Sequence, residues 1–167
     1  LNNAIRIGRA MDQFDMLWQE ELIQPTNVES HVTLAAEIVA PVCVSERLIS
    51  KYQFREYLRA GAAEVAMPDL IWTGGITETR KIANMAEAEQ RPVAPHDMTG
   101  PVNVFACAHI CMNAPNAWLM ETCRAFYGEG GWYSDILEQN IRVVDGEVET
   151  DVYHEENILF SVSTKDA

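Results

Sequence analysis

Five ionisable residues recur at nearly regular intervals along this chain, each at the end of a short apolar run. They are Glu20, Glu46, Asp69, His96 and Glu121. Successive members lie between 23 and 27 residues apart. One such placement is common by chance, but five in phase are typical of a barrel whose active site lies on one face. We therefore predict that these five side chains converge.

Glu20 and Glu46 are the kind of ligand that a hard cation prefers. Carboxylate oxygens from neighbouring strand ends suit Mg²⁺, which keeps part of its water shell. Each residue also has an ordinary interpretation, since Glu20 could be a surface carboxylate and Glu46 could pair with Arg47. For the two residues together we favour a Mg²⁺ site.

Asp69 and His96 are expected on neighbouring strands, where they would form an acid–base pair. An aspartate beside an imidazole orients the ring and raises its basicity. A lone histidine here would more often be a core residue bonded to the backbone, but the matching phase of Asp69 favours catalysis. Glu121, if protonated, would donate a hydrogen bond to developing negative charge. The predicted chemistry is proton abstraction next to a carboxylate, with Mg²⁺ stabilising the resulting enediolate.

The elements that would position these residues alternate along the chain. Short apolar runs predict strands over residues 16–22, 42–44, 63–70, 92–96 and 117–123, and helical patterns predict helices over residues 3–14, 27–40, 52–61, 74–90 and 100–113. Such alternation indicates right-handed crossovers and a parallel sheet. The tail differs, because residues 140–153 read as a hairpin around Asp145 and Gly146.

Composition limits the partners and the setting of the protein. The net charge of −13 disfavours nucleic acid and anionic membranes as partners. The four cysteines, Cys43, Cys107, Cys111 and Cys123, form no CxxC pair and predict reduced, buried thiols in a cytoplasmic protein. On a helix His109 would point away from the face that Cys107 and Cys111 share, so this cluster predicts core packing rather than a metal site.

Several motifs resemble those of a known family. "WQEEL", "SERL", "AMPDLIWTGGITETRKIA", "VAPHDMTGPV" and "WLMETC" resemble the mandelate racemase subgroup of the enolase superfamily, from about Ala4 to Trp132. The stretches "HDMTGP" and "RAFYGEGGWYSDIL" are most similar to its acid-sugar dehydratase members. Local departures from the family pattern are Leu22, where proline is usual, and Ser45, where glycine is usual.

This resemblance implies roles for the five residues. It implies a (β/α)7β barrel with Glu20 and Glu46 as ligands of Mg²⁺. It also implies His96, paired with Asp69, as the catalytic base or acid, and Glu121 as the electrophilic partner. In the dehydratases of this family the histidine can also protonate the leaving 3-hydroxide.

We therefore expect the α/β class and a partial TIM-type barrel of about five β-α units with a hairpin-like tail, forming one partial domain over residues 1–167. The family's capping domain, early barrel strands, third metal ligand and acid–base lysine would all precede Leu1.

The expected function is that of a Mg²⁺-dependent acid-sugar dehydratase acting on a small sugar acid. The full-length protein is expected to be a homo-oligomer. Two alternatives stay open. One is racemisation or epimerisation of a 2-hydroxy acid within the same superfamily. The other is a truncated, non-catalytic fragment.

Overall fold

The computed structural model describes residues 1–123, 125, 130–136, 142–152 and 158–162. Its helices are α1 (Asn2–Met11), α2 (Val28–Glu37), α3 (Lys51–Arg59), α4 (Leu70–Thr73), α5 (Ile76–Ala88), α6 (Pro101–Asn113) and α8 (Tyr133–Ile136), with a 3-10 turn at Asp12–Phe14. Its strands are β1 (Gln19–Glu20), β2 (Val42–Val44), β3 (Val65–Ala66), β4 (Arg142–Val144), β5 (Glu147–Val152) and β6 (Ile158–Val162).

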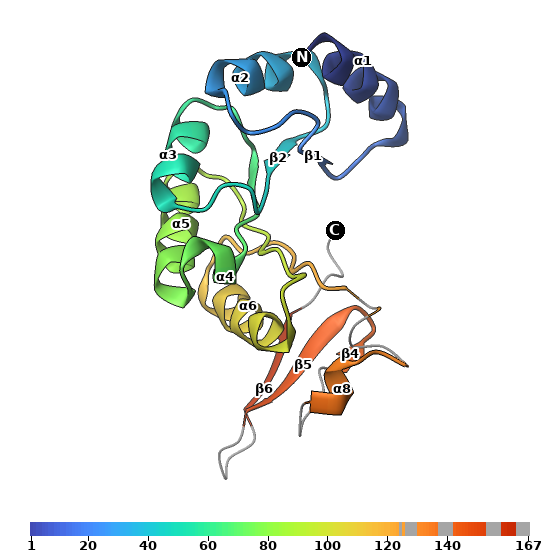
Figure 1. Ribbon diagram of the computed structural model, residues 1–167, viewed down its shortest axis with the longest axis vertical. Coiled ribbons are helices and arrows are strands. Elements are labelled where there is room, and N and C mark those ends of the chain that lie inside the picture. The colour runs from blue at the N-terminus through green and yellow to red at the C-terminus, as the bar shows by residue number, and fades with distance from the viewer. Residues whose placement is uncertain (124, 126–129, 137–141, 153–157, 163–167) are drawn as a thin grey trace.

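The first three strands form a parallel sheet in the order β1-β2-β3. Two extended segments continue it, because parallel bridges join Ala66 to Val93 and Val93 to Ala117. Helices α2, α3, α5 and α6 follow one another along the outside of an arc, with the sheet on its inner side (Figure 1). This arrangement confirms the α/β class and the partial barrel.

The strands are shorter than predicted. Residues 92–96 and 117–123 take part only in isolated bridges, because Pro92 and Pro95 lack the N–H group that a regular ladder needs. The predicted strand over residues 63–70 is wrong at its end. It stops at Ala66, and Leu70 already begins helix α4, which the apolar pattern did not reveal.

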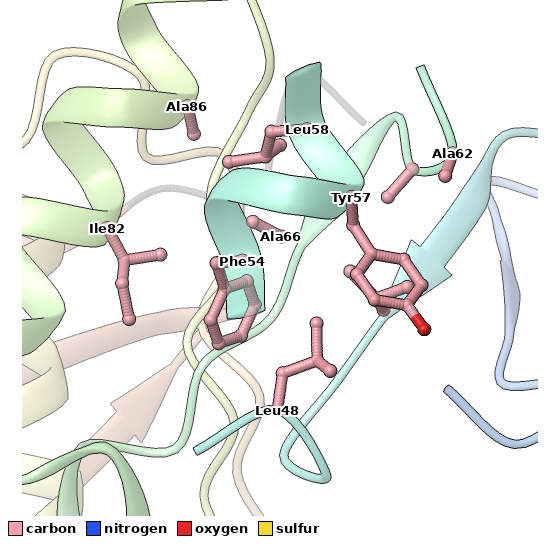
Figure 2. Close-up of a cluster of buried hydrophobic side chains, with 10 residues drawn as sticks. Leu48, Phe54, Tyr57, Leu58, Ala62, Ala66, Ile82 and Ala86 are labelled. Carbon is pink, nitrogen blue, oxygen red and sulfur yellow. The ribbon is translucent and has the colours of Figure 1, made fainter. Parts of the chain in front are cut away.

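The outer layer of the core lies between α3, α5 and the sheet. Phe54, Tyr57 and Leu58 follow the spacing that places side chains on one helical face, and all three are buried. Figure 2 shows them beside Ile82 and Ala86 of α5, in one cluster. Burying a side chain such as Phe54 contributes about 1.5–3 kcal/mol, so this layer fixes the helices against the strands.

The inner side of the arc has a separate apolar layer. Cys43, Val65 and Ala94 are buried there, and Trp18 and Trp118 pack against them. The two indole rings meet edge to face, with centroids 5.7 Å apart. Trp18 precedes the first strand and Trp118 lies in the last parallel segment, so this ring contact joins the first and last parallel segments on the inner side of the sheet.

The tail has the predicted hairpin. Strands β4 and β5 pair antiparallel around Asp145 and Gly146, which both have positive φ angles, of 52° and 81°. That conformation is the one that a two-residue hairpin turn requires, and Asp-Gly supplies it readily. Strand β6 adds a third member to this sheet. Residues 140, 141 and 153 of the predicted hairpin lie outside the described part of the chain.

The cysteine–histidine cluster can also be compared with the fold. Cys107 and Cys111 are buried and His109 is exposed, as the helical spacing predicts. Across the ranges given above, no helix is both long enough and apolar enough to cross a membrane.

Candidate active site

The five predicted site residues all lie at or just beyond the carboxyl ends of the parallel segments. Glu20 ends β1, and Glu46 lies two residues after β2. A parallel bridge joins Asp69 to His96, and the Glu121 N–H donates to the Pro95 carbonyl at 3.1 Å. The carboxyl edge of the sheet therefore brings these residues together.

Asp69 holds the imidazole of His96 in a fixed orientation. The distance from His96 Nδ1 to Asp69 Oδ2 is 2.9 Å, and Asp69 is fully buried. The other carboxylate oxygen, Oδ1, accepts the backbone N–H groups of Ile71 and Trp72 at 2.8 and 3.1 Å, which makes Asp69 the N-cap of α4. The start of helix α4 holds the Asp69 carboxylate in place through Oδ1. The carboxylate in turn orients the His96 ring through Oδ2.

The second ring nitrogen of His96 faces two more carboxylates. Its Nε2 lies 3.6 Å from Glu121 Oε2 and 3.9 Å from Glu46 Oε2. Burial lowers the pKa of His96, but the hydrogen bond to Asp69 and the charges of Glu121 and Glu46 outweigh burial and raise the pKa above its ordinary value. The ring is thus a strengthened base whose free nitrogen faces the other acidic groups.

Glu121 lies in a setting that favours its protonated form. Burial raises the pKa of the Glu121 carboxyl, and the charges of Glu20 and Glu46 add to this rise, whereas His96 and the backbone N–H of Asp97 oppose it. A carboxyl with a raised pKa holds its proton more readily and can act as a hydrogen-bond donor. This setting matches the donor role considered for Glu121.

The chemistry of Glu20 and Glu46 fits a hard cation. Burial raises the pKa of the Cys43 thiol, and the charges of Glu20, Glu21, Glu121 and Glu46 add to this rise, so the inner side of the strands has an acidic field. Glu20 is exposed, and Glu46 accepts a short hydrogen bond from the Ser45 hydroxyl. Among the described residues, no three His, Cys, Asp or Glu side chains are grouped to hold a metal, so these two would supply part of such a site.

Arg47 pairs with Glu21 and not with Glu46. Arg47 Nε lies 2.7 Å from Glu21 Oε2, so the ordinary interpretation that paired Glu46 with Arg47 is wrong. Glu21 is also not a plain surface residue, because only 12% of its side chain is exposed. Burial, followed by the charge of Glu46, raises the pKa of Glu21 against the lowering effect of Arg47.

The structure adds residues to the site that the strand pattern missed. The Thr99 hydroxyl and the Asn103 side-chain amide approach Asp69 Oδ2, at 3.3 and 3.4 Å. The half-exposed ring of Trp72 lies 6.2 Å from the His96 ring, centroid to centroid. Thr99 and Asn103 come from the loop and helix after His96, and Trp72 from α4, so a search restricted to strand ends could not find them.

Comparisons with known proteins show the family of this chain. The family model of enolase C-terminal domain-like proteins matches residues 1–152. A D-galactonate dehydratase from Ralstonia nicotianae is 41% identical over 130 residues, which cover 77% of this chain and 34% of the relative. The chain thus spans about a third of the length of the curated relatives it matches.

Solved structures give the same result. An enolase of the mandelate racemase subgroup from Agrobacterium tumefaciens, with sodium and phosphate, has a TM-score of 0.82 at 42% identity, covering 87% of this chain and 39% of its own. A putative galactarate dehydratase from Agrobacterium radiobacter, with bound sodium and L-malate, has a TM-score of 0.69 at 30% identity, covering 72% of this chain and 30% of its own. With a family model over most of its length, this chain belongs to the enolase C-terminal domain-like family, within its mandelate racemase/muconate lactonizing enzyme group.

Proposed function

We propose that this chain is part of a Mg²⁺-dependent acid-sugar dehydratase, for which it supplies the catalytic ends of the later barrel strands. The observation that carries the proposal is the setting of His96. Its Nδ1 is held by Asp69 at 2.9 Å, and its Nε2 faces Glu121 and Glu46 at 3.6 and 3.9 Å. One orientation of the ring therefore presents Nε2 to the carboxylates of Glu121 and Glu46.

In this proposal, His96 moves protons at Nε2. With Nδ1 fixed to Asp69, Nε2 takes the proton from the carbon next to the substrate carboxylate, or delivers a proton to the leaving hydroxyl. Delivery turns that hydroxyl into water, so the elimination releases no free hydroxide. Glu121, with its raised pKa, donates a hydrogen bond where negative charge develops.

Glu20 and Glu46 would hold the cation in this proposal. When bound, Mg²⁺ supplies positive charge that stabilises the negative charge developing on the substrate carboxylate. The two carboxylates leave the remaining positions to water and other oxygen donors, which suits Mg²⁺. The acidic field of the site would otherwise repel an anionic substrate, so a cation here also accounts for acid recognition.

The relatives support the substrate class. One is named D-galactonate dehydratase, and one solved structure with bound L-malate is described as a putative galactarate dehydratase. Both names refer to sugar acids. This chain covers about a third of those proteins, and the corresponding activity is therefore part of the proposal.

The test is to express the protein from the full reading frame that encodes this chain and to assay it with aldonic and aldaric acids, in Mg²⁺ or in EDTA. We expect a 2-keto-3-deoxy acid product that forms only with the cation. His96→Asn should abolish turnover and leave the fold intact, with some loss of thermal stability because Asp69 loses its buried partner. His109→Asn, on the exposed side of α6, is the matched control and should keep full activity.

Two results would contradict the proposal. Inversion of a 2-hydroxy acid without loss of water would replace dehydration with racemisation or epimerisation. Undiminished activity in His96→Asn would remove this residue from the mechanism.

A further inference from the structure

Helix α6 contributes a buried amide to the neighbourhood of the His96–Asp69 pair. The Asn103 side chain is almost fully buried, and its Nδ2 lies near three acceptors. It approaches Asp97 Oδ1 at 3.0 Å, the His96 carbonyl at 3.2 Å and Asp69 Oδ2 at 3.4 Å. The Asn103 side chain thus contacts Asp69, His96 and Asp97, the residue that follows His96.

Asp97 is the acceptor nearest to that amide. It follows His96 directly, is fully buried, and has its Oδ1 against the Asn103 Nδ2. Within the described residues its Oδ2 has no hydrogen-bond partner, and neither has the Asn103 Oδ1. A buried carboxylate with one oxygen unpartnered is costly even though the Thr99 backbone also contacts it, so its contact with Asn103 needs a specific reason.

The contact decides which end of the amide faces the pair. The two ends of an asparagine amide have nearly the same shape, but only the NH₂ end can donate. If the amide turned over, its oxygen would oppose three acceptor oxygens at once. The Asp97 carboxylate therefore holds the donor end toward Asp69 and the His96 carbonyl.

We propose that Asn103 and Asp97 are positioning residues for the His96–Asp69 pair, with Asp97 acting mainly through Asn103. The catalytic consequence rests on the proposed function, but the orientation of the ring can be measured without substrate. The alternative is that this network merely ties α6 to the sheet.

The first measurement is the ¹⁵N-edited NMR signal of the His96 Nδ1–H, identified by its loss in His96→Asn. Removing the Asn103 donor with Asn103→Leu should speed exchange of this proton with water about three- to tenfold, the effect of losing a hydrogen bond of ordinary strength. Asn103→Ala is the second variant, in case the branched leucine is not accommodated. Unchanged exchange in a folded variant would overturn the proposal.

The matched control is Asn116→Leu. Like Asn103, Asn116 uses its side-chain NH₂ group as a donor. The acceptors are the backbone carbonyls of Ala83 and Arg91, at 3.1 and 2.9 Å. It precedes the last parallel segment, away from the carboxyl edge where His96 lies. If Asn103→Leu changed the exchange rate only by loosening the packing of helices on the sheet, Asn116→Leu should change it as strongly. The His96 signal should nevertheless be unaffected by Asn116→Leu, and an equal effect would favour the tying role.

The route through Asn103 is tested by a double-mutant cycle. Asp97→Asn removes the charged partner and should speed exchange of the same proton by a smaller factor than Asn103→Leu. In the double variant the effect of Asp97→Asn should shrink, because the path through Asn103 has gone and only the direct effect of the Asp97 charge on Asp69 and His96 remains. Additive effects of the two substitutions would show that Asp97 acts by another route and would overturn that part of the proposal.

Activity gives an independent arm. If the acid-sugar screen succeeds, Asn103→Leu should lower kcat about ten- to a hundredfold with little change in KM, since the ring would be misplaced and the substrate contacts kept. If the screen finds no activity, the proposed function fails, while the NMR comparison still decides whether Asn103 positions the ring.

Discussion

Asp69 performs two tasks with its two carboxylate oxygens. One oxygen caps helix α4, and the other holds His96. An asparagine keeps an oxygen for the helix but presents an NH₂ group to the ring, which then adopts the other tautomer. We predict that Asp69→Asn lowers the free energy of unfolding by about 1–2 kcal/mol, because the helix cap stays but the buried Asn103 amide loses its acceptor at Oδ2. It should lower kcat about a hundred- to ten-thousandfold.

Asp69→Ala is the comparison for that prediction. It removes the cap and leaves buried donors without partners, so we expect a loss of about 2–4 kcal/mol of stability in urea unfolding. Equal destabilisation by Asp69→Asn and Asp69→Ala would show that the two oxygens do not have separate tasks.

Asp97 should make stability depend on pH in an unusual direction. Burial raises its pKa from 3.8 to about 6, so the folded protein holds this proton more tightly than the unfolded chain does. The stability that this proton gives is fully present below pH 3.8 and is lost as pH rises through about 6, a change of up to about 3 kcal/mol. Asp97→Asn should remove this fall.

The measurement is urea unfolding across that pH range for the wild type and for Asp97→Asn. The exposed residue Asp15, changed to Asn, is the control and should leave the slope as it is. If the wild type and Asp97→Asn have parallel profiles, Asp97 does not titrate differently in the folded state.

At the residue scale, the sequence could predict which side chains gather but not how they pair. A strand's carboxyl end is marked by the end of its apolar run, so Glu20, Glu46 and Glu121 could be placed. The partner of Arg47 could not, because Glu21 adopts a positive φ of 42° that no pattern indicates. Asn103 was missed because a polar residue in a helix is ordinarily exposed.

At the scale of elements, helix starts were more predictable than strand lengths. Asn27 was expected to begin a helix, and its side chain accepts the Ser30 N–H at 2.7 Å. Strand length depends instead on which backbone groups of the neighbour are in register, and a proline on either strand interrupts the pairing. That explains why the segment from Pro92 to His96 has bridges only.

The two side-chain caps of α2 and α3 should differ in strength. Asn27 accepts at 2.7 Å, whereas the Ser50 hydroxyl accepts the Gln53 N–H at 3.4 Å. We predict that Asn27→Ala costs about 1 kcal/mol in unfolding free energy and that Ser50→Ala costs less. Asn27→Asp keeps a cap and is the control. A larger loss for Ser50→Ala would contradict the ranking by distance.

At the scale of the whole molecule, the parallel segments form an open series. Among the described residues, β1 pairs only with β2 on one side, and the segment around Ala117 pairs only with that around Val93. Such edges carry backbone N–H and C=O groups that can pair with another chain. We predict that residues 1–167, expressed by themselves, associate as concentration rises.

Gel filtration with light scattering over a wide range of concentration measures this association. A mass that grows with concentration is the expected result. Magnesium should bind weakly to the same preparation, because two carboxylates leave most of the coordination to water. A stable monomer that binds the cation tightly would contradict both expectations.

The contact between Trp18 and Trp118 has an optical consequence. Two indoles that meet edge to face at 5.7 Å couple their excited states, so together they should give a signed pair of circular dichroism bands that neither gives alone. Because the rings belong to the first and last parallel segments, that signal reports the separation of these two segments. Trp118→Phe should erase it and leave the backbone spectrum in place. The circular dichroism signal of this tryptophan pair thus reports, in dilute solution and without a label, whether the curvature of the sheet is native.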